Sequence, residues 1–317
     1  RASGAIHILS PYQAKARSSW YEGTANAIYQ NMHFMKMYNP EYVLVLSGDH
    51  IYKMDYAAML KAHIETGADC TIAAIDVPLN EASRFGILNT NPGGSIYQFE
   101  EKPKAPKSTL ASMGIYIFTA EKLFKYLEKD DADPNSSKDF GKDVLPAMLN
   151  AGEKMYSYLF EGYWKDVGTI ASLWQANMDL LGDTPAFDVK DKAWKIHSRN
   201  PLAPPEYIGS RAVVKNSMIA LGCEIEGTVE NSILGSNVVV EKGAVVKDAV
   251  VLANSVIKAG ACVSYSIIDE NVTVGKGAVV GVDKNPKAEI VVLGRDITVG
   301  DGIRVLSGQK NEKDILA

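Results

Sequence analysis

A repeat of six residues in the C-terminal third of the chain constrains the fold more than any other feature. The repeat lies within a longer phrase, whose second positions (217, 232, 249 and 266) are separated by 15, 17 and 17 residues. Hexads of an aliphatic residue, often a glycine, and a small residue are typical of a parallel β-helix with three short strands per coil. Chance alternation in a β-sandwich predicts neither period. We therefore predict a β-helix over residues 208–317, with these side chains inside it: Ile208, Val214, Ile219, Ile225, Leu234, Val240, Val246, Ile257, Val263, Ile268, Val274 and Val280.

The positions of the histidines bear on what such a solenoid does. Many hexapeptide β-helices are acyltransferases that use a histidine base between neighbouring coils. All histidines of this chain precede the repeats: His7, His33, His50, His63 and His197. Without a base of suitable pKa the coils lack the usual chemical means of acyl transfer. We therefore predict that the solenoid is structural, with flat faces for oligomerisation, and that catalysis belongs to the preceding half.

Residues 1–185 alternate helical and strand patterns. Helical patterns cover four segments, of which the second ends at a glycine: 24–38, 56–66, 123–129 and 170–181. Strand patterns cover four others, with a turn at 91–94: 70–77, 87–89, 95–99 and 114–118. This alternation predicts an α/β domain with a mixed or mainly parallel sheet between helices. A proline-rich stretch then indicates a linker over 186–207.

The composition is that of an ordinary globular protein. Apolar residues make up 46% and charged residues 22% of the chain, and the net charge of -5 argues against a nucleic-acid partner. No apolar run reaches the roughly 18 residues of a membrane span, and no signal peptide is visible. The three cysteines (Cys70, Cys223 and Cys262) are far apart and lack CxxC spacing. We therefore predict a cytoplasmic protein that binds neither membranes nor nucleic acids.

A strand that ends on a carboxylate is the first sign of chemistry. The run 42–46 is apolar without alternation, which favours a strand buried on both faces of a parallel sheet. Ser47 and Gly48 break the run, and Asp49 follows where the strand should stop. Ligands of open α/β sheets bind beyond the carboxyl ends of the strands, and a carboxylate there commonly holds Mg²⁺. The alternative is that Asp49 only caps the next helix.

Seven segments in this order resemble the sugar-1-phosphate nucleotidyltransferases, and among them the bacterial glucose-1-phosphate adenylyltransferase branch. The segments are Trp-Tyr-Glu-Gly-Thr-Ala (20–25), Ser-Gly-Asp-His-Ile-Tyr (47–52), Glu-Ala-Ser-Arg-Phe-Gly (81–86), Phe-Glu-Glu-Lys-Pro (99–103), Leu-Ala-Ser-Met-Gly-Ile-Tyr (110–116), Asp-Phe-Gly-Lys-Asp (139–143) and Tyr-Trp-Lys-Asp-Val-Gly-Thr (163–169). The resemblance implies a Rossmann-like nucleotidyltransferase sheet sandwich followed by a left-handed β-helix. It also implies transfer of the adenylyl group of ATP to glucose 1-phosphate, for glycogen synthesis.

The resemblance also implies roles for particular residues. Asp49, Lys102 and Asp166 are the expected catalytic residues, with the two aspartates holding Mg²⁺ and the lysine facing the sugar phosphate. For Asp166, capping of the following helix is the alternative. The remaining expected residues bind glucose 1-phosphate (Tyr21, Gly86, Glu101 and Ser112, together with Lys102) or the nucleotide (Gly23, Thr24 and Gly48).

One family feature is absent from this sequence. The family carries a glycine-rich, basic loop near its N-terminus that wraps the triphosphate, whereas the only early glycine here is Gly4. We therefore expect that an N-terminal stretch with this loop and the first strand of the sheet is missing, and that activity of residues 1–317 alone is doubtful.

Two other functions stay open on the sequence alone. One is transfer from UTP, dTTP or GTP on the same fold, because a fold does not set the choice of base. The other is a non-catalytic regulatory subunit, against which the presence of Asp49, Lys102 and Asp166 speaks. The family further implies a homotetramer or a heterotetramer with a related subunit, and a sugar-phosphate or nucleotide effector.

Overall fold

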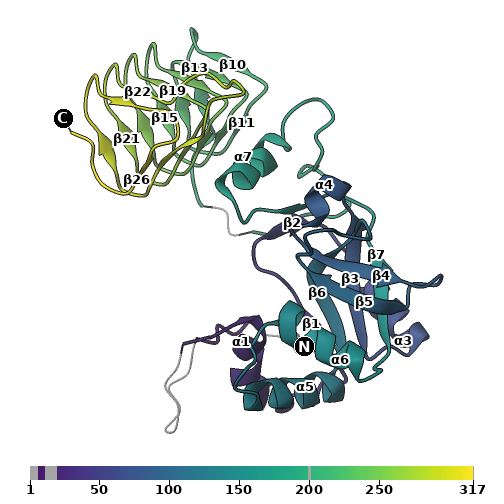
Figure 1. The fold of residues 1–317 in the computed structure, drawn as a ribbon. Coiled ribbons are helices and arrows are strands. Elements are labelled where there is room, and N and C mark those ends of the chain that lie inside the picture. The colour runs from purple at the N-terminus through teal and green to yellow at the C-terminus, as the bar shows by residue number, and fades with distance from the viewer. Residues whose placement is uncertain (1–5, 11–19, 199–200, 317) are drawn as a thin grey trace. The chain divides into compact units, whose positions relative to one another are not determined.

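The computed structural model describes residues 6–10, 20–198 and 201–316, which form two compact units (Figure 1). We call the first the sheet unit: it runs to Gly48 and continues over Lys53–Gly162. We call the second the solenoid unit: it contains Asp49–Tyr52 and the chain from Tyr163 onward. The predicted boundaries at 185 and 207 stay predictions; between 186 and 206, the described residues contain no helix or strand.

The sheet unit is built on a mixed sheet, in agreement with the prediction of an α/β fold. Its strands follow the order β5-β4-β6-β3-β7, and β1 also pairs with β6. Of the described pairs only β3 and β7 are parallel. The long strand β6 has β3 along one edge, while β4 and β1 share the other. The strands are β1 (Tyr42–Val45), β3 (Cys70–Asp76), β4 (Gly86–Thr90), β5 (Ile96–Glu101), β6 (Leu110–Thr119) and β7 (Met155–Leu159).

The strand before Asp49 differs from the prediction. β1 is antiparallel to β6, with Tyr42 opposite Thr119, and is only partly buried. Its apolar residues alternate: Val43 and Val45 pack against the core of the unit, whereas Leu44 is 38% exposed. The prediction of a strand buried on both faces is therefore wrong, because the unbroken apolar run includes residues of an outward face.

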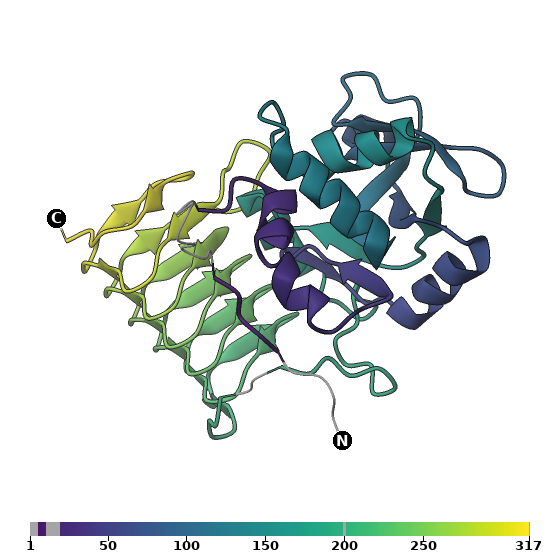
Figure 2. The same ribbon diagram turned by 90° about the horizontal axis from the view of Figure 1, so that it is seen from below.

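Helices of the sheet unit bury the core against the sheet. α3 (Tyr56–Thr66) has the predicted bounds: Asp55 caps it by accepting from two backbone N–H groups, and Gly67 ends it at φ 58°. The single helix predicted over 24–38 is instead two helices that meet at Asn31. α1, α5 and α6 lie together and α3 lies apart from them (Figure 2). The other helices are α1 (Thr24–Gln30), α2 (Met32–Lys36), α4 (Leu79–Ala82), α5 (Ala120–Ala132), a π-helix (Phe140–Val144) and α6 (Leu145–Asn150).

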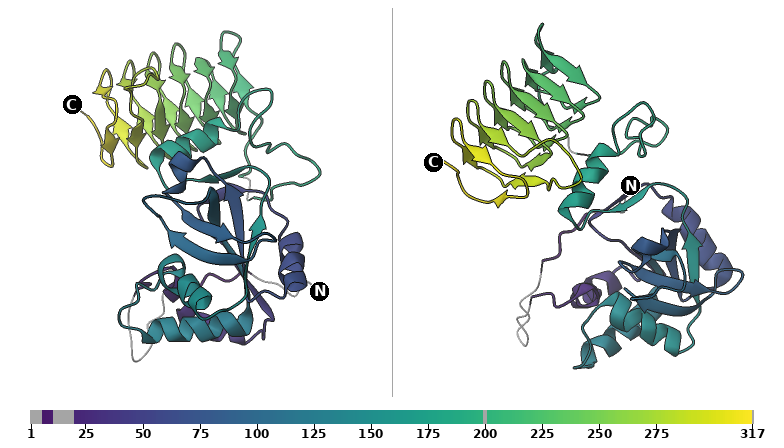
Figure 3. Two further views of the ribbon diagram at one scale, coloured as in Figure 1. Left: turned by 45° about the vertical axis from the view of Figure 1, so that its right-hand side comes forward. Right: turned by 45° about the horizontal axis from the view of Figure 1, so that its top comes forward.

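The solenoid unit contains the predicted parallel β-helix, made of three six-stranded parallel sheets (Figure 3). The first sheet contains β10 (Val213–Lys215), β13 (Thr228–Glu230), β16 (Val245–Lys247), β19 (Cys262–Ser264), β22 (Val279–Val280) and β25 (Arg304–Val305). The second contains β11 (Met218–Ile219), β14 (Ile233–Leu234), β17 (Val250–Val251), β20 (Ser266–Ile268), β23 (Val291–Leu293) and β26 (Lys310–Asn311). The third contains β9 (Tyr207–Ile208), β12 (Glu224–Ile225), β15 (Val239–Val240), β18 (Val256–Ile257), β21 (Thr273–Val274) and β24 (Thr298–Val299).

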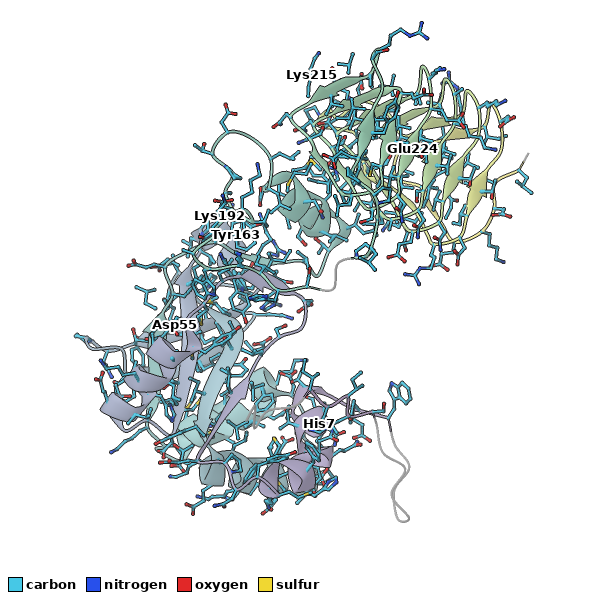
Figure 4. All side chains as sticks on the ribbon, turned by 180° about the vertical axis from the view of Figure 1, so that it is seen from behind. His7, Asp55, Tyr163, Lys192, Lys215 and Glu224 are labelled. Atoms are coloured by element: carbon cyan, nitrogen blue, oxygen red, sulfur yellow. The ribbon has the colours of Figure 1, made fainter. Side chains whose placement is uncertain are left out.

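The hexad residues form the core of the solenoid. Nine of the twelve are at most 2% exposed, and Val214 and Ile219 pack against them. Ile208 is the exception at 49% exposed, because β9 is the last strand of its sheet and has a neighbour on one side only. Charged side chains such as Lys215 and Glu224 lie on the outside of the coils (Figure 4).

Stacked asparagines turn one corner of the coils. Asn237, Asn254 and Asn271 have left-handed backbones with φ of 60° or 61°, and each side-chain amide donates to the next residue in the stack. The last acceptor is Asp296, at φ 62°. Asparagine and aspartate tolerate this conformation better than other residues with a side chain. No helix among the described residues has the length and hydropathy required to cross a membrane.

Candidate functional site

The predicted metal-binding aspartates lie at a small two-stranded sheet within the solenoid unit: Asp166 is the last residue of one strand, and Asp49 comes directly before the other. β2 (His50–Tyr52) is antiparallel to β8 (Trp164–Asp166), and His50 is directly opposite Asp166. Nε2 of His50 lies 3.6 Å from Oδ1 of Asp49 and 4.0 Å from Oδ1 of Asp166. The fold therefore brings together two carboxylates that are far apart in the sequence.

Neither aspartate caps a helix. Asp55 is the N-cap of α3, the first helix after Asp49. Thr169 is the N-cap of α7 (Ile170–Met178), where its side chain and that of Ser172 form a capping box. Oδ1 of Asp166 instead accepts from the backbone N–H of Gly168 at 2.8 Å. The alternative of a capping role therefore fails for both residues.

The two carboxylates suit Mg²⁺ in chemistry. Mg²⁺ prefers oxygen ligands and is usually held by one or two carboxylates, with water and substrate phosphates completing its shell. The side chain of Asp49 is 61% exposed and that of Asp166 is 28% exposed, so a cation can reach both. Among the described residues no group of three or more His, Cys, Asp or Glu side chains is placed to hold a metal. Asp49 and Asp166 are therefore the two candidate protein ligands for a metal at this site.

His50 belongs to this site, although the sequence did not single it out. Its ring lies edge-on against Trp164 with 5.2 Å between the ring centroids, and its Nδ1 is buried without a hydrogen-bond partner in the described part of the chain. The sequence could have indicated this, because His50 directly follows Asp49, and a residue next to a carboxylate at the end of a strand lies close to any ligand bound there.

A second group of predicted residues surrounds Glu101 in the sheet unit. Gly86 pairs with Glu101 across β4 and β5. A Cβ on Gly86 would lie 2.5 Å from the ring of Phe99 and 3.0 Å from Oε2 of Glu101, and one on Gly141 would lie 2.6 Å from the same oxygen. Both glycines are therefore required for the carboxylate to occupy this place.

Burial and nearby charges shift the pKa of the Glu101 carboxyl. Burial raises its pKa, Lys102 and Lys142 lower it, and Asp139 raises it further, with a net rise above the ordinary value. Nζ of Lys102 lies 3.8 Å from Oε1 of Glu101, and its side chain is 65% exposed. The backbone of Lys102 is left-handed, at φ 48°, and its N–H donates to the carbonyl of Phe85. A half-buried carboxylate thus lies beside an exposed cation, which suits a ligand with hydroxyl groups and a phosphate.

Ser112 and Glu101 both influence the pKa of Tyr116. The side chain of Ser112 is buried in β6, and its hydroxyl accepts from the N–H of Gly114 at 3.3 Å. Burial raises the pKa of Tyr116 well above its usual range, and the nearby carboxylates of Glu101 and Asp139 contribute to this rise. Among the described residues no hydrogen bond or ion pair joins Ser112 to Glu101, and the role expected for Ser112 stays a prediction.

Gly23 and Thr24, two of the residues predicted for the nucleotide, lie against other parts of the protein. The backbone N–H groups of Ala25 and Asn26, at the start of α1, donate to the carbonyl of Lys138. A Cβ on Gly23 would lie 2.3 Å from that carbonyl oxygen. Thr24 donates to Asp139 at 3.1 Å and accepts from the N–H of Phe140. These contacts join α1 to the loop before the π-helix.

Tyr21 and Gly48 are not brought to Glu101 by any described contact. The hydroxyl of Tyr21 donates to the carbonyl of Leu9 at 3.0 Å and accepts from Asn31 at 2.8 Å. Around Gly48 no heavy atom comes within 4 Å of a Cβ built there. The roles expected for Tyr21, Gly23, Thr24 and Gly48 stay predictions.

Family models match both halves of the chain. A family model described as nucleotidyl transferase matches residues 3–182, and one described as GlmU-like C-terminal hexapeptide matches 205–305. A Bacillus cereus protein named glucose-1-phosphate adenylyltransferase is 51% identical over 316 residues, which are 100% of this chain and 77% of that protein. Proteins of the same name from Clostridium botulinum and Clostridium perfringens are 59% and 58% identical, over 79% and 80% of this chain.

The chain is shorter than these relatives, spanning 65% of the length of both Clostridium proteins. The nucleotidyl transferase model nevertheless covers more than half of it, and the predicted order of a nucleotidyltransferase domain and a hexapeptide β-helix is confirmed. The chain belongs to the nucleotidyl transferase family.

Proposed function

We propose that the protein transfers the adenylyl group of ATP to glucose 1-phosphate, giving ADP-glucose and pyrophosphate. The observation that carries the proposal is the meeting of Asp49 and Asp166 around His50 on the β2–β8 pair. Relatives at 51% and 59% identity are named glucose-1-phosphate adenylyltransferase, which supports ATP over UTP, dTTP or GTP as the nucleotide.

The reaction requires no covalent bond between the substrates and the protein. An oxygen of the glucose 1-phosphate phosphate attacks the α-phosphorus of ATP, and a new P–O bond forms. The bond from the α-phosphorus to the oxygen that bridges it to the β-phosphorus breaks, and pyrophosphate leaves with that electron pair. The attacking phosphate is already ionised, so no base is required. Positioning and charge neutralisation therefore account for most of the catalysis.

Each of the two groups has a separate task in this proposal. Asp49 and Asp166 hold Mg²⁺, which neutralises phosphate charge when bound. Glu101 accepts hydrogen bonds from sugar hydroxyls, and the exposed ammonium of Lys102 binds the sugar phosphate. Gly86 and Gly141 leave room for the Glu101 carboxylate. Ser112 donates a hydrogen bond to glucose 1-phosphate. Tyr21 extends the sugar-phosphate site, and Gly23, Thr24 and Gly48 face the nucleotide.

We also propose a biosynthetic role, an assembly state and an effector for the enzyme. ADP-glucose is an activated glucosyl donor, so the product serves the synthesis of an α-glucan such as glycogen. The solenoid mediates assembly into a tetramer, either of identical chains or with a related subunit. A sugar phosphate or a nucleotide is the proposed effector. A regulatory subunit without activity is the alternative, and the retained Asp49, Lys102 and Asp166 argue against it.

A nucleotide panel tests the proposal. The full natural protein that carries this chain is incubated with glucose 1-phosphate, Mg²⁺ and each of ATP, UTP, dTTP and GTP, and pyrophosphate release is measured. We expect ATP to give a kcat/KM at least about tenfold above the others. Preference for another nucleotide would move the protein to another branch of the family. No release with any of the four would favour the regulatory subunit.

A further inference from the structure

The side chains of β8 alternate between two faces of the strand. On one face the ring of Trp164 contacts His50, and Asp166 lies near Nε2 of the same histidine. The flanking residues Tyr163 and Lys165 point the other way, and both contact a single carboxylate. This is the period of two expected of a strand. The strand that presents Asp166 is therefore held from its opposite face.

That carboxylate belongs to Asp179, the C-cap residue of α7. Its Oδ2 accepts from the hydroxyl of Tyr163 at 2.8 Å and lies 3.1 Å from Nζ of Lys165, while Oδ1 accepts from Gln175 at 2.8 Å. The side chain is 15% exposed. Burial raises the pKa of Asp179, but the hydrogen bonds from Gln175, Tyr163 and Lys165 outweigh it and hold the pKa below its usual value. The residue is a charged acceptor with all its partners in place.

The helix that carries Asp179 is fixed to the solenoid. Trp174 of α7 is 3% exposed, donates from Nε1 to the carbonyl of Asp248 at 2.8 Å and lies edge-on to Tyr265. It belongs to an apolar cluster with Val250, Ile267 and Ile290 on the outer side of the β-helix. The ribbon shows α7 beside the coils of the β-helix (Figure 3). Because α7 is fixed in this way, Asp179 is a rigid point from which β8 can be held.

The β2–β8 pair needs such support. Each strand has three residues, and the described part of the chain adds no third strand to the pair. An isolated two-stranded pair is marginally stable in water at best. Metal ligands, by contrast, depend on groups around them to keep a fixed direction. The contacts of Asp179 supply that support to the strand that ends on Asp166.

We propose that Asp179 is a positioning residue for Asp166: by holding Tyr163 and Lys165 it fixes the direction in which Asp166 presents its oxygens to a divalent cation. This inference rests on the proposed function, because it takes Asp166 as a metal ligand. It gives the solenoid a task beyond assembly, since the β-helix, α7 and Asp179 together support the metal-binding strand.

The test measures binding of Mn²⁺ alone to the full natural protein, from the electron paramagnetic resonance signal of the free ion. The variants are Asp179→Asn, its conservative partner Asp179→Glu, and Asp183→Asn as a control that makes the same change at an exposed aspartate of the same region. We expect Asp179→Asn to weaken Mn²⁺ binding about tenfold or more and to raise the Mg²⁺ concentration for half-maximal activity equally. The KM for glucose 1-phosphate should stay unchanged, Asp179→Glu should recover part of the affinity, and Asp183→Asn should resemble the wild type.

Tyr163→Phe provides a second variant if Asp179→Asn does not fold. It removes one hydrogen bond to Asp179 and keeps the ring that stacks on Phe187, and we expect a loss of Mn²⁺ affinity of about threefold or more. Asp166→Asn distinguishes a wrong positioning role for Asp179 from a wrong assignment of the metal site. If it loses Mn²⁺ binding while folded Asp179→Asn, or Tyr163→Phe in its place, binds as the wild type does, the positioning role is refuted and the proposed function stands. If Asp166→Asn binds Mn²⁺ like the wild type, the metal site itself is wrong and this inference fails with it.

Discussion

Replacement of Gly141 by alanine tests the Glu101 pocket without changing any charge. The added Cβ would lie 2.6 Å from Oε2 of Glu101, whereas an ordinary contact starts at 3.4 Å, so the carboxylate must retreat by about 0.8 Å. A misplacement of about 1 Å in a substrate-binding group can reduce the rate about 100-fold. We therefore expect kcat/KM for glucose 1-phosphate to fall roughly 30- to 100-fold, or about 2–3 kcal/mol of transition-state stabilisation.

The assay is steady-state formation of ADP-glucose at varied glucose 1-phosphate, with saturating ATP and Mg²⁺. Gly209→Ala is the matched control, because its Cβ would meet its nearest neighbour, the carbonyl oxygen of Ile225, at 3.3 Å, so only a small adjustment is needed. The shorter Glu101→Asp side chain leaves room for the new methyl group. Gly141→Ala should therefore cost much less on a Glu101→Asp background than on the wild type. Wild-type kinetics in a folded Gly141→Ala variant, or equal costs on both backgrounds, would refute the assignment of Glu101 to the sugar.

Two further predictions concern stability and use equilibrium denaturation by urea. Ile257→Ala should lower the free energy of unfolding by about 2–5 kcal/mol, because Ile257 is fully buried between Val240 and Val274 of the neighbouring coils. Ile208 is half exposed on the first coil, so Ile208→Ala should cost less than about 1 kcal/mol. Equal costs at the two sites would contradict the inward orientation of the hexads. Burial lowers the pKa of His63 below its ordinary value of 6.5, although Asp69 opposes this shift, so the unfolded chain takes up the proton first. The stabilisation from neutral His63 is complete above about pH 6.5 and is lost as the pH falls toward the lowered pKa. His63→Gln should therefore remove this part of the pH dependence of the free energy of unfolding. An unchanged pH dependence in that variant would contradict it.

Local signals in the sequence predicted the regular parts of the fold. The helix over Tyr56–Thr66 ends at Gly67 as predicted, and its N-cap, Asp55, is also the residue next to its end. The hexads predict the β-helix because each coil repeats the same short-range pattern. The exposure of Ile208 could not be predicted in this way, because it depends on which coil is the first of the stack. These features depend on neighbours in sequence or on the repeat itself.

Features that depend on distant partners were not predictable. The exposure of Leu44 follows from the place of β1 beside β6, and the side-chain partner of Thr24 is Asp139. The position of His50 between two carboxylates depends on the pairing of β2 with β8. In each case the sequence shows the residue type, while the contact that gives it a role arises only from tertiary structure.

Transfer of the α-phosphate of ATP by the full natural protein tests the proposed reaction directly. The enzyme is incubated with ATP labelled at the α-phosphorus, glucose 1-phosphate and Mg²⁺, and the label in ADP-glucose is measured for the wild type, Asp49→Asn and Asp166→Asn. We expect labelled ADP-glucose from the wild type and a loss of about 100-fold or more in each variant, because either change removes one of the two carboxylates proposed to hold Mg²⁺. Wild-type rates of label transfer in both folded variants would contradict it.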